Sequence, residues 1–157
     1  AMPSGNGANF TVELWVKLPT AGIYVQSASM YTGGGFINYI QGPGTNDDLQ
    51  FASYTGTTDY YNPLVDVSVG VWHQIVQSYN SNVRYGWIDG SSVATSTRGS
   101  GRTAAGANAS IDYGFLPWGS SNSFVLDLGI IRVYTDTLTN AEVQNNYDAN
   151  KSDFGLS

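Results

Sequence analysis

The sequence predicts an all-β, antiparallel fold that ends in one short helix, and three observations support this prediction. Glycine (19 residues) and tyrosine (11) are abundant, while charged residues make up only 11% of the 157 residues, as expected for short strands joined by turns. Residues 71–93 contain two runs rich in aromatic and β-branched residues, separated and followed by turn-forming residues. A helix signal occurs only near the C-terminus.

Residues 1–8 are predicted to be a lead-in, and residues 9–157 a single domain. From Phe10 to Lys17 apolar side chains alternate with Thr11, Glu13 and Trp15, which predicts a strand whose second face is partly wetted. Trp15 lies beneath a covering segment or forms a binding platform. Further strands are predicted at 23–27, 36–40, 49–54 and 64–69, the last at a sheet edge, with a polar loop at 55–63.

The central ribbon, residues 71–93, is predicted to form three short strands joined by two tight turns. Residues 71–79 hold residue types that suit a half-buried strand, and residues 83–88 alternate between the two faces of a strand. In the second run Val83, Tyr85 and Trp87 share one face of the strand. Asp89-Gly90 then predicts a type I′ hairpin turn, because both central positions of that turn need positive φ.

The C-terminal part is predicted to contain a loop at 95–107, a strand at 108–113, a loop at 114–122 and a last strand at 124–134. Because nearly every position of 124–134 is apolar, this strand is expected to be covered on both faces. Thr139 and Glu142 have the spacing of a capping box, and Leu138 and Val143 that of a hydrophobic staple. They predict a helix over about 140–149 that packs across the sheets.

Charge and composition exclude several classes of partner. The formal net charge of −6 argues against nucleic acid and anionic membranes, because both require a basic surface. No apolar run approaches the roughly 20 residues of a membrane span, and the chain has no cysteine for disulfides or thiolate metal sites.

Catalytic and metal-binding residues are scarce. His73 is the only histidine and lies within a predicted strand beside Trp72, which favours a structural role. The two glutamates, Glu13 and Glu142, lie near opposite ends of the chain, whereas glycoside hydrolysis needs paired carboxylates. Residues 46–48, Asn-Asp-Asp, could bind Ca²⁺ together with Asp59, or form a solvated acidic turn. The chain is therefore predicted not to be an enzyme.

A family resemblance rests on three stretches. Residues 71–93 resemble the centre of laminin-G-like, concanavalin A-like domains, in the positions Trp72, Tyr79-Asn80 and Trp87-Ile88-Asp89-Gly90. Residues 9–19 are similar to the opening strand of that family, and residues 128–149 to its closing strand and helix. The resemblance implies a two-sheet antiparallel jelly-roll sandwich with one short C-terminal helix.

The departures from the family bear on function. Glucanases of this architecture have E-x-D-x-(x)-E along one strand, and lyases of this architecture have a Gln/His/Tyr/Arg set with basic strand motifs; neither is present here. Related domains place an acid in the closing strand to bind calcium, whereas residues 129–134 are Gly-Ile-Ile-Arg-Val-Tyr. No cofactor or metal is therefore expected.

Aromatic side chains on predicted loops are the candidate binding residues. Sugar rings stack on Tyr and Trp faces, while amides and carboxylates bind hydroxyls. The first loop group is Asp59, Tyr60, Tyr61 and Asn62, and the second contains Trp118 and Asn122; Tyr31 and Tyr54 lie at strand ends, and Arg98 and Arg102 could bind a carboxylate or sulfate. The alternative is that each ring packs beneath its own loop.

These observations predict a non-catalytic recognition module that binds a glycan or cell-surface polysaccharide. We expect it to be part of a larger extracellular, cell-surface or virion protein, because residues 145–156 resemble the tail of such domains in phage and large-virus structural proteins. The alternative is a structural or assembly module of a capsid or fibre, with other virion or surface proteins as partners. A lyase or hydrolase would need acid or base groups that converge in a cleft.

Overall fold

The computed structural model describes residues 9–17, 25–26, 35–41, 48–54, 58–60, 65–80, 83–97 and 127–157. In chain order the elements are β1 (Phe10–Lys17), β2 (Val25–Gln26), β3 (Gly35–Gln41), β4 (Asp48–Tyr54), β5 (Thr58–Tyr60), β6 (Val65–Asp66), β7 (Trp72–Asn80), β8 (Val83–Ile88), β9 (Ser91–Thr97), β10 (Asp127–Tyr134), α1 (Asn140–Asn150) and the 3₁₀ helix η1 (Lys151–Phe154).

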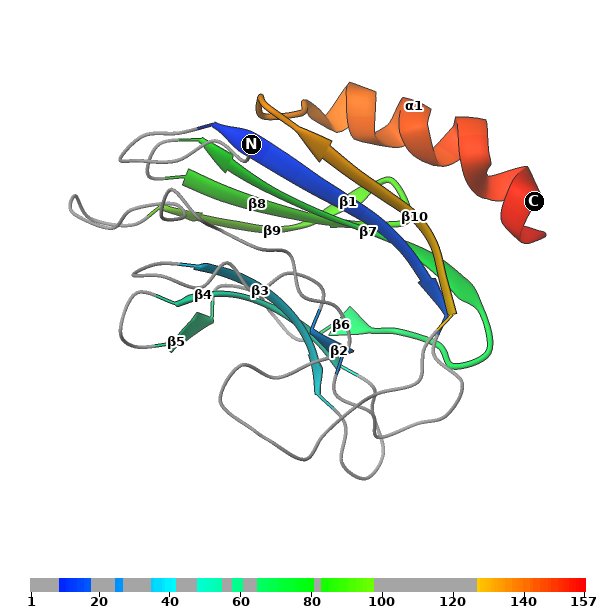
Figure 1. The fold of residues 1–157 in the computed structure, drawn as a ribbon, viewed down its shortest axis with the longest axis horizontal. Helices are drawn as coiled ribbons and strands as arrows, with labels where there is room; N and C mark the ends of the chain where they lie inside the picture. The colour runs from blue at the N-terminus through cyan, green and yellow to red at the C-terminus, as the bar shows by residue number, and fades with distance from the viewer. Residues whose placement is uncertain are drawn as a thin grey trace.

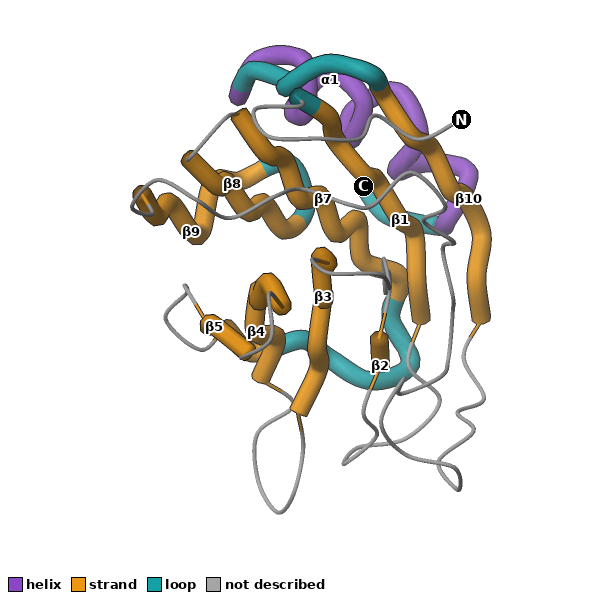
Figure 2. The backbone as a smooth tube through the Cα atoms, turned by 60° about the vertical axis from the view of Figure 1, so that its left-hand side comes forward, coloured by secondary structure: helices purple, strands orange, loops and turns teal. Residues whose placement is uncertain are grey.

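The strands form two antiparallel sheets that face each other (Figure 1). One sheet has the order β10-β1-β7-β8-β9, and the other has the order β2-β3-β4-β5 with β6 paired to β4. Helix α1 lies on the side of the first sheet that faces away from the second, as Figure 2 shows. The predicted two-sheet sandwich with one C-terminal helix is confirmed. Strand β5 lies where the sequence predicted a polar loop.

The hairpin between β8 and β9 has the predicted turn. Asp89 (φ 50°) and Gly90 (φ 77°) both have positive φ, as a type I′ turn requires. The amide of Asp89 donates a hydrogen bond to the carbonyl of Gln74 at 2.9 Å, which fixes the turn to β7. The β7–β8 pairing extends from Ile75↔Ile88 to Asn80↔Val83.

Strand β1 is buried on both faces. Its inner face (Phe10, Val12, Leu14 and Val16) is at most 1% exposed, and so are Thr11, Glu13 and Trp15 on its outer face. The prediction of a partly wetted outer face is therefore wrong for Glu13. The physical reason is the C-terminal segment, which covers this face: Tyr147 and Phe154 stack on Trp15 with ring centroids 5.7 and 4.4 Å away. The expectation of a covering segment over Trp15 is confirmed.

Strand β10 is an edge strand, so the prediction of a strand covered on both faces is wrong. It pairs with β1 alone in the described part of the chain. Leu128, Ile131 and Val133 are 37%, 42% and 38% exposed. They pair with Val16, Leu14 and Val12 and therefore lie on the inner face. A side chain at a sheet edge has a neighbouring strand on one side only, which leaves these residues partly accessible.

Helix α1 has the predicted N-terminus. Thr139 accepts a hydrogen bond from the backbone amide of Glu142, and the Glu142 carboxylate accepts one from the Thr139 amide. Val143 is fully buried and packs with Val76 and Trp87 of the sheet, joined by the partly buried Leu138. The apolar contact holds the helix to the outer face of the sheet, and the cap fixes its first turn.

Candidate functional site

Three of the predicted binding residues lie in strands of the second sheet. Tyr54 is in β4, and Asp59 and Tyr60 are in β5, where Tyr54 pairs with Thr58 and Tyr60 pairs with Ala52. The three positions therefore belong to one β4–β5 ladder, with Tyr54 at the end next to the hairpin and Tyr60 at the other end. The other predicted binding residues lie outside the described residues: Tyr31, Tyr61, Asn62, Arg98, Arg102, Trp118 and Asn122. Their role stays a prediction.

His73 has a structural environment. Its Nδ1 lies 2.8 Å from Oδ2 of Asp89, and its Nε2 lies 3.3 Å from the carbonyl oxygen of Ser68. Oδ1 of Asp89 accepts a hydrogen bond from the backbone amide of Gln74. Both ring nitrogens thus face oxygen acceptors, and neither faces a hydroxyl that could serve as a nucleophile. The histidine connects the β8–β9 turn to the segment before β7.

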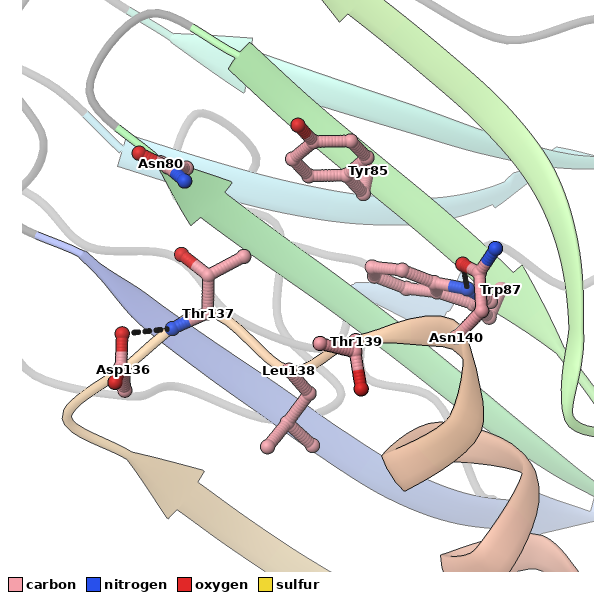
Figure 3. Close-up of a pocket in the computed structure, with 8 residues that line it drawn as sticks. All are labelled: Asn80, Tyr85, Trp87, Asp136, Thr137, Leu138, Thr139 and Asn140. Carbon is pink, nitrogen blue, oxygen red and sulfur yellow. Dashed lines mark hydrogen bonds between the residues drawn. The ribbon is translucent and has the colours of Figure 1, made fainter.

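A pocket of about 320 Å³ lies on the outer face of the first sheet, where the chain crosses from β10 to α1. Figure 3 shows it between strand β8 and this connection. The lining residues are Asn80, Tyr85, Trp87, Asp136, Thr137, Leu138, Thr139 and Asn140. Its size is at the lower end for ligand pockets, which suits one or two small rings.

The aromatic wall of the pocket comes from β8. Tyr85 and Trp87 are two residues apart on one strand and therefore project from the same face. Their rings stack with centroids 5.8 Å apart and an interplanar angle of 27°. Trp87 is 1% exposed and donates from Nε1 to Oδ1 of Asn140 at 2.9 Å, whereas Tyr85 is half-buried. Tyr85 is thus the ring that a ligand can reach.

The polar wall comes from residues 136–140, which hydrogen bonds pin to the sheet. Thr11 Oγ1 donates to the carbonyl of Asp136 at 2.8 Å and accepts from the amide of Leu138 at 3.0 Å. Thr137 Oγ1 donates to the carbonyl of Tyr79 at 2.9 Å. The pocket is therefore preformed, because its mouth is fixed to buried strand residues.

Several polar atoms of the pocket are available to a ligand. Oδ1 of Asp136 accepts from the amide of Thr137, and Oδ1 of Asn140 accepts from Trp87. Among the described residues, no partner occupies Oδ2 of Asp136, Nδ2 of Asn140, the hydroxyl of Tyr85 or the side-chain amide of Asn80. These atoms include donors and acceptors beside an aromatic face, a combination that can bind a ring with several hydroxyl groups.

A second polar cluster, centred on Glu13, is sealed. The Glu13 carboxylate is fully buried and accepts hydrogen bonds from five side chains: Trp15 (3.3 Å), Gln74 (3.0 Å), Arg132 (2.9 Å), Tyr134 (2.7 Å) and Asn146 (3.0 Å). Burial raises the pKa of Tyr134 to about 12, and the hydrogen bond to the Glu13 carboxylate and its charge contribute further. The carboxylate thus joins strands β1, β7 and β10 to helix α1 through hydrogen bonds that use its acceptor capacity.

The sequence contained part of the signal for the pocket. Alternation placed Tyr85 and Trp87 on one face of a strand, but nothing local indicated that residues 136–140 would lie beside them.

Within the segments that the structure describes, no group of three His, Cys, Asp or Glu side chains could hold a metal ion. The candidate calcium residues Asn46 and Asp47 lie outside those segments. None of the described helices is long and apolar enough to cross a bilayer.

Comparison with known proteins identifies the fold. The family model of the concanavalin A-like lectin/glucanases superfamily matches residues 2–144. Domain 4 of AbnA, a GH43 extracellular arabinanase from Geobacillus stearothermophilus solved with arabinotriose, is 20% identical, with a TM-score of 0.70 over 91% of this chain and 69% of that one. No curated protein matches the sequence significantly.

Two further structures share the fold at lower identity. The heptameric SAP-like pentraxin of Limulus polyphemus is 15% identical, with a TM-score of 0.63 over 91% of this chain and 70% of that one. The binding domain of botulinum neurotoxin serotype D is 12% identical, with a TM-score of 0.70 over 94% of this chain. The chain spans 37% of the toxin domain, so it corresponds to only part of it.

Proposed function

Because the chain belongs to the concanavalin A-like lectin/glucanases superfamily, we propose that it is a non-catalytic carbohydrate-recognition module of a larger extracellular, cell-surface or virion protein. The fold by itself does not specify an activity, so the proposal depends on the pocket beside β8 and α1. Its partner is a glycan or cell-surface polysaccharide.

The accessible face of Tyr85 is the observation that supports sugar binding. It lies in a pocket whose rim holds three polar groups without partners among the described residues: a carboxylate oxygen of Asp136, the side-chain amide of Asn80 and the amide nitrogen of Asn140. The electron-rich ring face attracts the C–H side of a sugar, and the polar atoms can bind its hydroxyls. Since hydrogen bonds hold residues 136–138 to Thr11, little ordering is needed when a ligand binds.

The related structures support the same kind of ligand and setting. The arabinanase domain was solved in complex with arabinotriose, and its parent enzyme is described as extracellular. The serotype D toxin domain is described as a binding domain, and the similar domain of botulinum neurotoxin type G as a receptor binding domain. Recognition of a sugar or receptor by this sandwich is thus compatible with its architecture.

The positions of the two glutamates support a non-catalytic role. Glu13 is buried with five hydrogen-bond donors around it, and Glu142 accepts hydrogen bonds from its own helix cap. Neither glutamate is among the lining residues of the pocket, where Asp136 is the one carboxylate of the described lining. Glycoside hydrolysis requires an acid and a base or nucleophile on either side of the bond.

A glycan array followed by calorimetric titration tests the proposal and separates two binding surfaces. We expect Tyr85→Ala to weaken binding by about tenfold or more, because loss of a stacking face costs on the order of 1.4 kcal/mol. Tyr85→Phe keeps the ring and serves as the matched control. If Trp118→Ala abolishes binding while Tyr85→Ala does not, the ligand binds at the predicted loop surface. An array without signal for the wild type contradicts sugar binding.

An assembly module is the second candidate, because strand β10 has an exposed apolar stripe. Leu128, Ile131 and Val133 lie on one face of this edge strand and are each more than a third exposed. Such a stripe is typical of a protein interface. Analytical ultracentrifugation of the wild type and Ile131→Lys distinguishes this function: a stable multimer that the substitution dissociates would favour assembly, and a monomer would contradict it.

A further inference from the structure

We infer that the pocket beside β8 and α1 selects uncharged saccharides and rejects those with a carboxylate or sulfate group. The juxtaposition that supports this is a single charged lining residue, Asp136, opposite the Tyr85 ring, with no cation among the described residues of the lining. The inference rests on the proposed function, since it specifies the class of sugar that the same pocket binds.

The lining has negative charge at its mouth. Asp136 is exposed at the end of β10, and its Oδ2 has no partner among the described residues. A second carboxylate, that of Glu142, lies next to the lining residue Thr139, whose hydroxyl donates to it at 2.8 Å. An anionic ligand would meet like charges here, which is unfavourable, most of all at low ionic strength.

The N-terminus of helix α1 does not offset this charge. A helix N-terminus attracts anions through its unpaired amides and its positive dipole end. Here Thr139 Oγ1 accepts from the Glu142 amide, and the Glu142 carboxylate accepts from the Thr139 amide at 2.8 Å. The hydrogen bonds of the cap lower the pKa of Glu142, so this carboxylate is ionised at neutral pH and complements the dipole. The Glu142 carboxylate therefore already occupies the position at the N-terminus of α1 where an anionic ligand would otherwise bind.

The cations of the described segments are held elsewhere. Three of them form ion pairs: Lys17 with Asp127 (2.7 Å), Arg132 with Glu13 (2.9 Å) and Lys151 with Asp148 (3.3 Å). The fourth, Arg84, is 1% exposed and alternates with Tyr85 along β8, so it projects from the opposite face of the sheet. Arg98 and Arg102 lie outside the described residues.

The available polar atoms match the hydroxyls of a neutral ring. A sugar hydroxyl donates one hydrogen bond and accepts others. Oδ2 of Asp136 can accept a hydrogen bond from one hydroxyl. Nδ2 of Asn140, whose amide is oriented by the bond from Trp87, can donate to another. A carboxylate in place of a hydroxyl has no proton to donate to Asp136 and adds repulsion.

Matched pairs of neutral and acidic glycans test the inference. The probes are immobilised glycans ending in glucose or glucuronate, galactose or galacturonate, and N-acetylglucosamine or its 6-sulfate, at low ionic strength, where charge effects are least screened. We expect each neutral member to bind more tightly than its acidic counterpart, by a margin of up to roughly fivefold. Asp136→Asn, which keeps the oxygen bound to Thr137, should reduce this margin.

Asp127→Asn is the control, because it removes the same charge at the opposite end of β10 and should leave the margin unchanged. Preferential binding of the acidic members, dependent on Tyr85 and insensitive to Asp136→Asn, would overturn the inference while the proposed function stands. Loss of acidic binding in Arg98→Gln or Arg102→Gln would overturn it too. An array without any signal would refute the proposed function and this inference together.

Discussion

The outer face of the first sheet has two regions beneath the same C-terminal segment, one sealed and one open. In the sealed region Glu13 is fully buried among five hydrogen-bond donors, and Trp15 is stacked between Tyr147 and Phe154. In the open region Tyr85 is half-buried, and a pocket of about 320 Å³ separates β8 from the β10–α1 connection.

The difference shows how one helix serves two purposes. Its middle supplies Asn146 and Tyr147, which complete the buried network and the aromatic stack. Its first turn supplies Asn140, whose amide oxygen is bound by Trp87 while the amide nitrogen remains available among the described residues. Satisfied polar groups stabilise the fold, whereas polar atoms left available at a preformed wall can bind a ligand.

The largest effect is expected for Glu13→Gln in the sealed region. The amide would place an NH₂ group against donors and leave Arg132 without its counter-charge, which should lower the free energy of unfolding by about 3 kcal/mol. Urea denaturation monitored by tryptophan fluorescence measures this change. A loss below about 1 kcal/mol would contradict a stabilising role for the buried carboxylate.

In the open region, the variant to compare with Glu13→Gln is Tyr85→Ala. Because this ring is half-buried, we expect a loss of roughly 1 kcal/mol in stability together with the loss of sugar binding. Glu13→Gln should instead bind normally at temperatures where it remains folded. If both variants lose stability and affinity in the same proportion, the two regions are not functionally distinct.

An effect on stability between these two is expected for Gly129→Ala, which tests the aromatic stack. A Cβ atom at Gly129 would lie 2.4 Å from Cε1 of Phe154 and 3.2 Å from Cζ3 of Trp72, so the ring of Phe154 must shift. Overpacking of this kind costs about 1–3 kcal/mol. In a double-mutant cycle, Phe154→Ala should relieve the penalty; additive effects would show that the two residues do not interact.

The helix cap at the border between the two regions should contribute less. Thr139→Ala removes the acceptor of the Glu142 amide and should lower stability by about 1 kcal/mol. Thermal unfolding by circular dichroism measures the change, and Thr139→Ser, which retains the hydroxyl, is the control. Equal melting temperatures for the alanine and serine variants would contradict the capping role.

The smallest effect is a pH dependence in the alkaline range. Tyr134 has a pKa of about 12 in the folded protein against 10.0 ordinarily, because it is desolvated and donates to the Glu13 carboxylate. The unfolded chain therefore loses this proton first, so the stabilisation is complete below pH 10 and is lost as the pH rises towards 12. Melting temperatures from pH 9 to 12 should fall more steeply for the wild type than for Tyr134→Phe; identical slopes would contradict this.

Local signals in the sequence determined much of the fold. Asp89-Gly90 predicted a turn with positive φ at both positions, and Thr139 with Glu142 predicted the start of α1. Such signals involve groups a few residues apart, so they act whatever the rest of the chain does. The alternating pattern of residues 83–88 predicted that Tyr85 and Trp87 share one face of a strand. The three family-like stretches predicted the two-sheet architecture.

Only the tertiary structure decided which of these faces would be covered. Glu13 belongs to an alternating strand whose outer face looked partly wetted, yet Asn146 and Tyr134, more than 100 residues away, bury it. The apolar run ending at Tyr134 was expected to be covered on both faces, and instead forms a sheet edge. The pocket likewise arises where residues 136–140 meet β8. Burial depends on contacts between distant segments, and no short-range pattern encodes them.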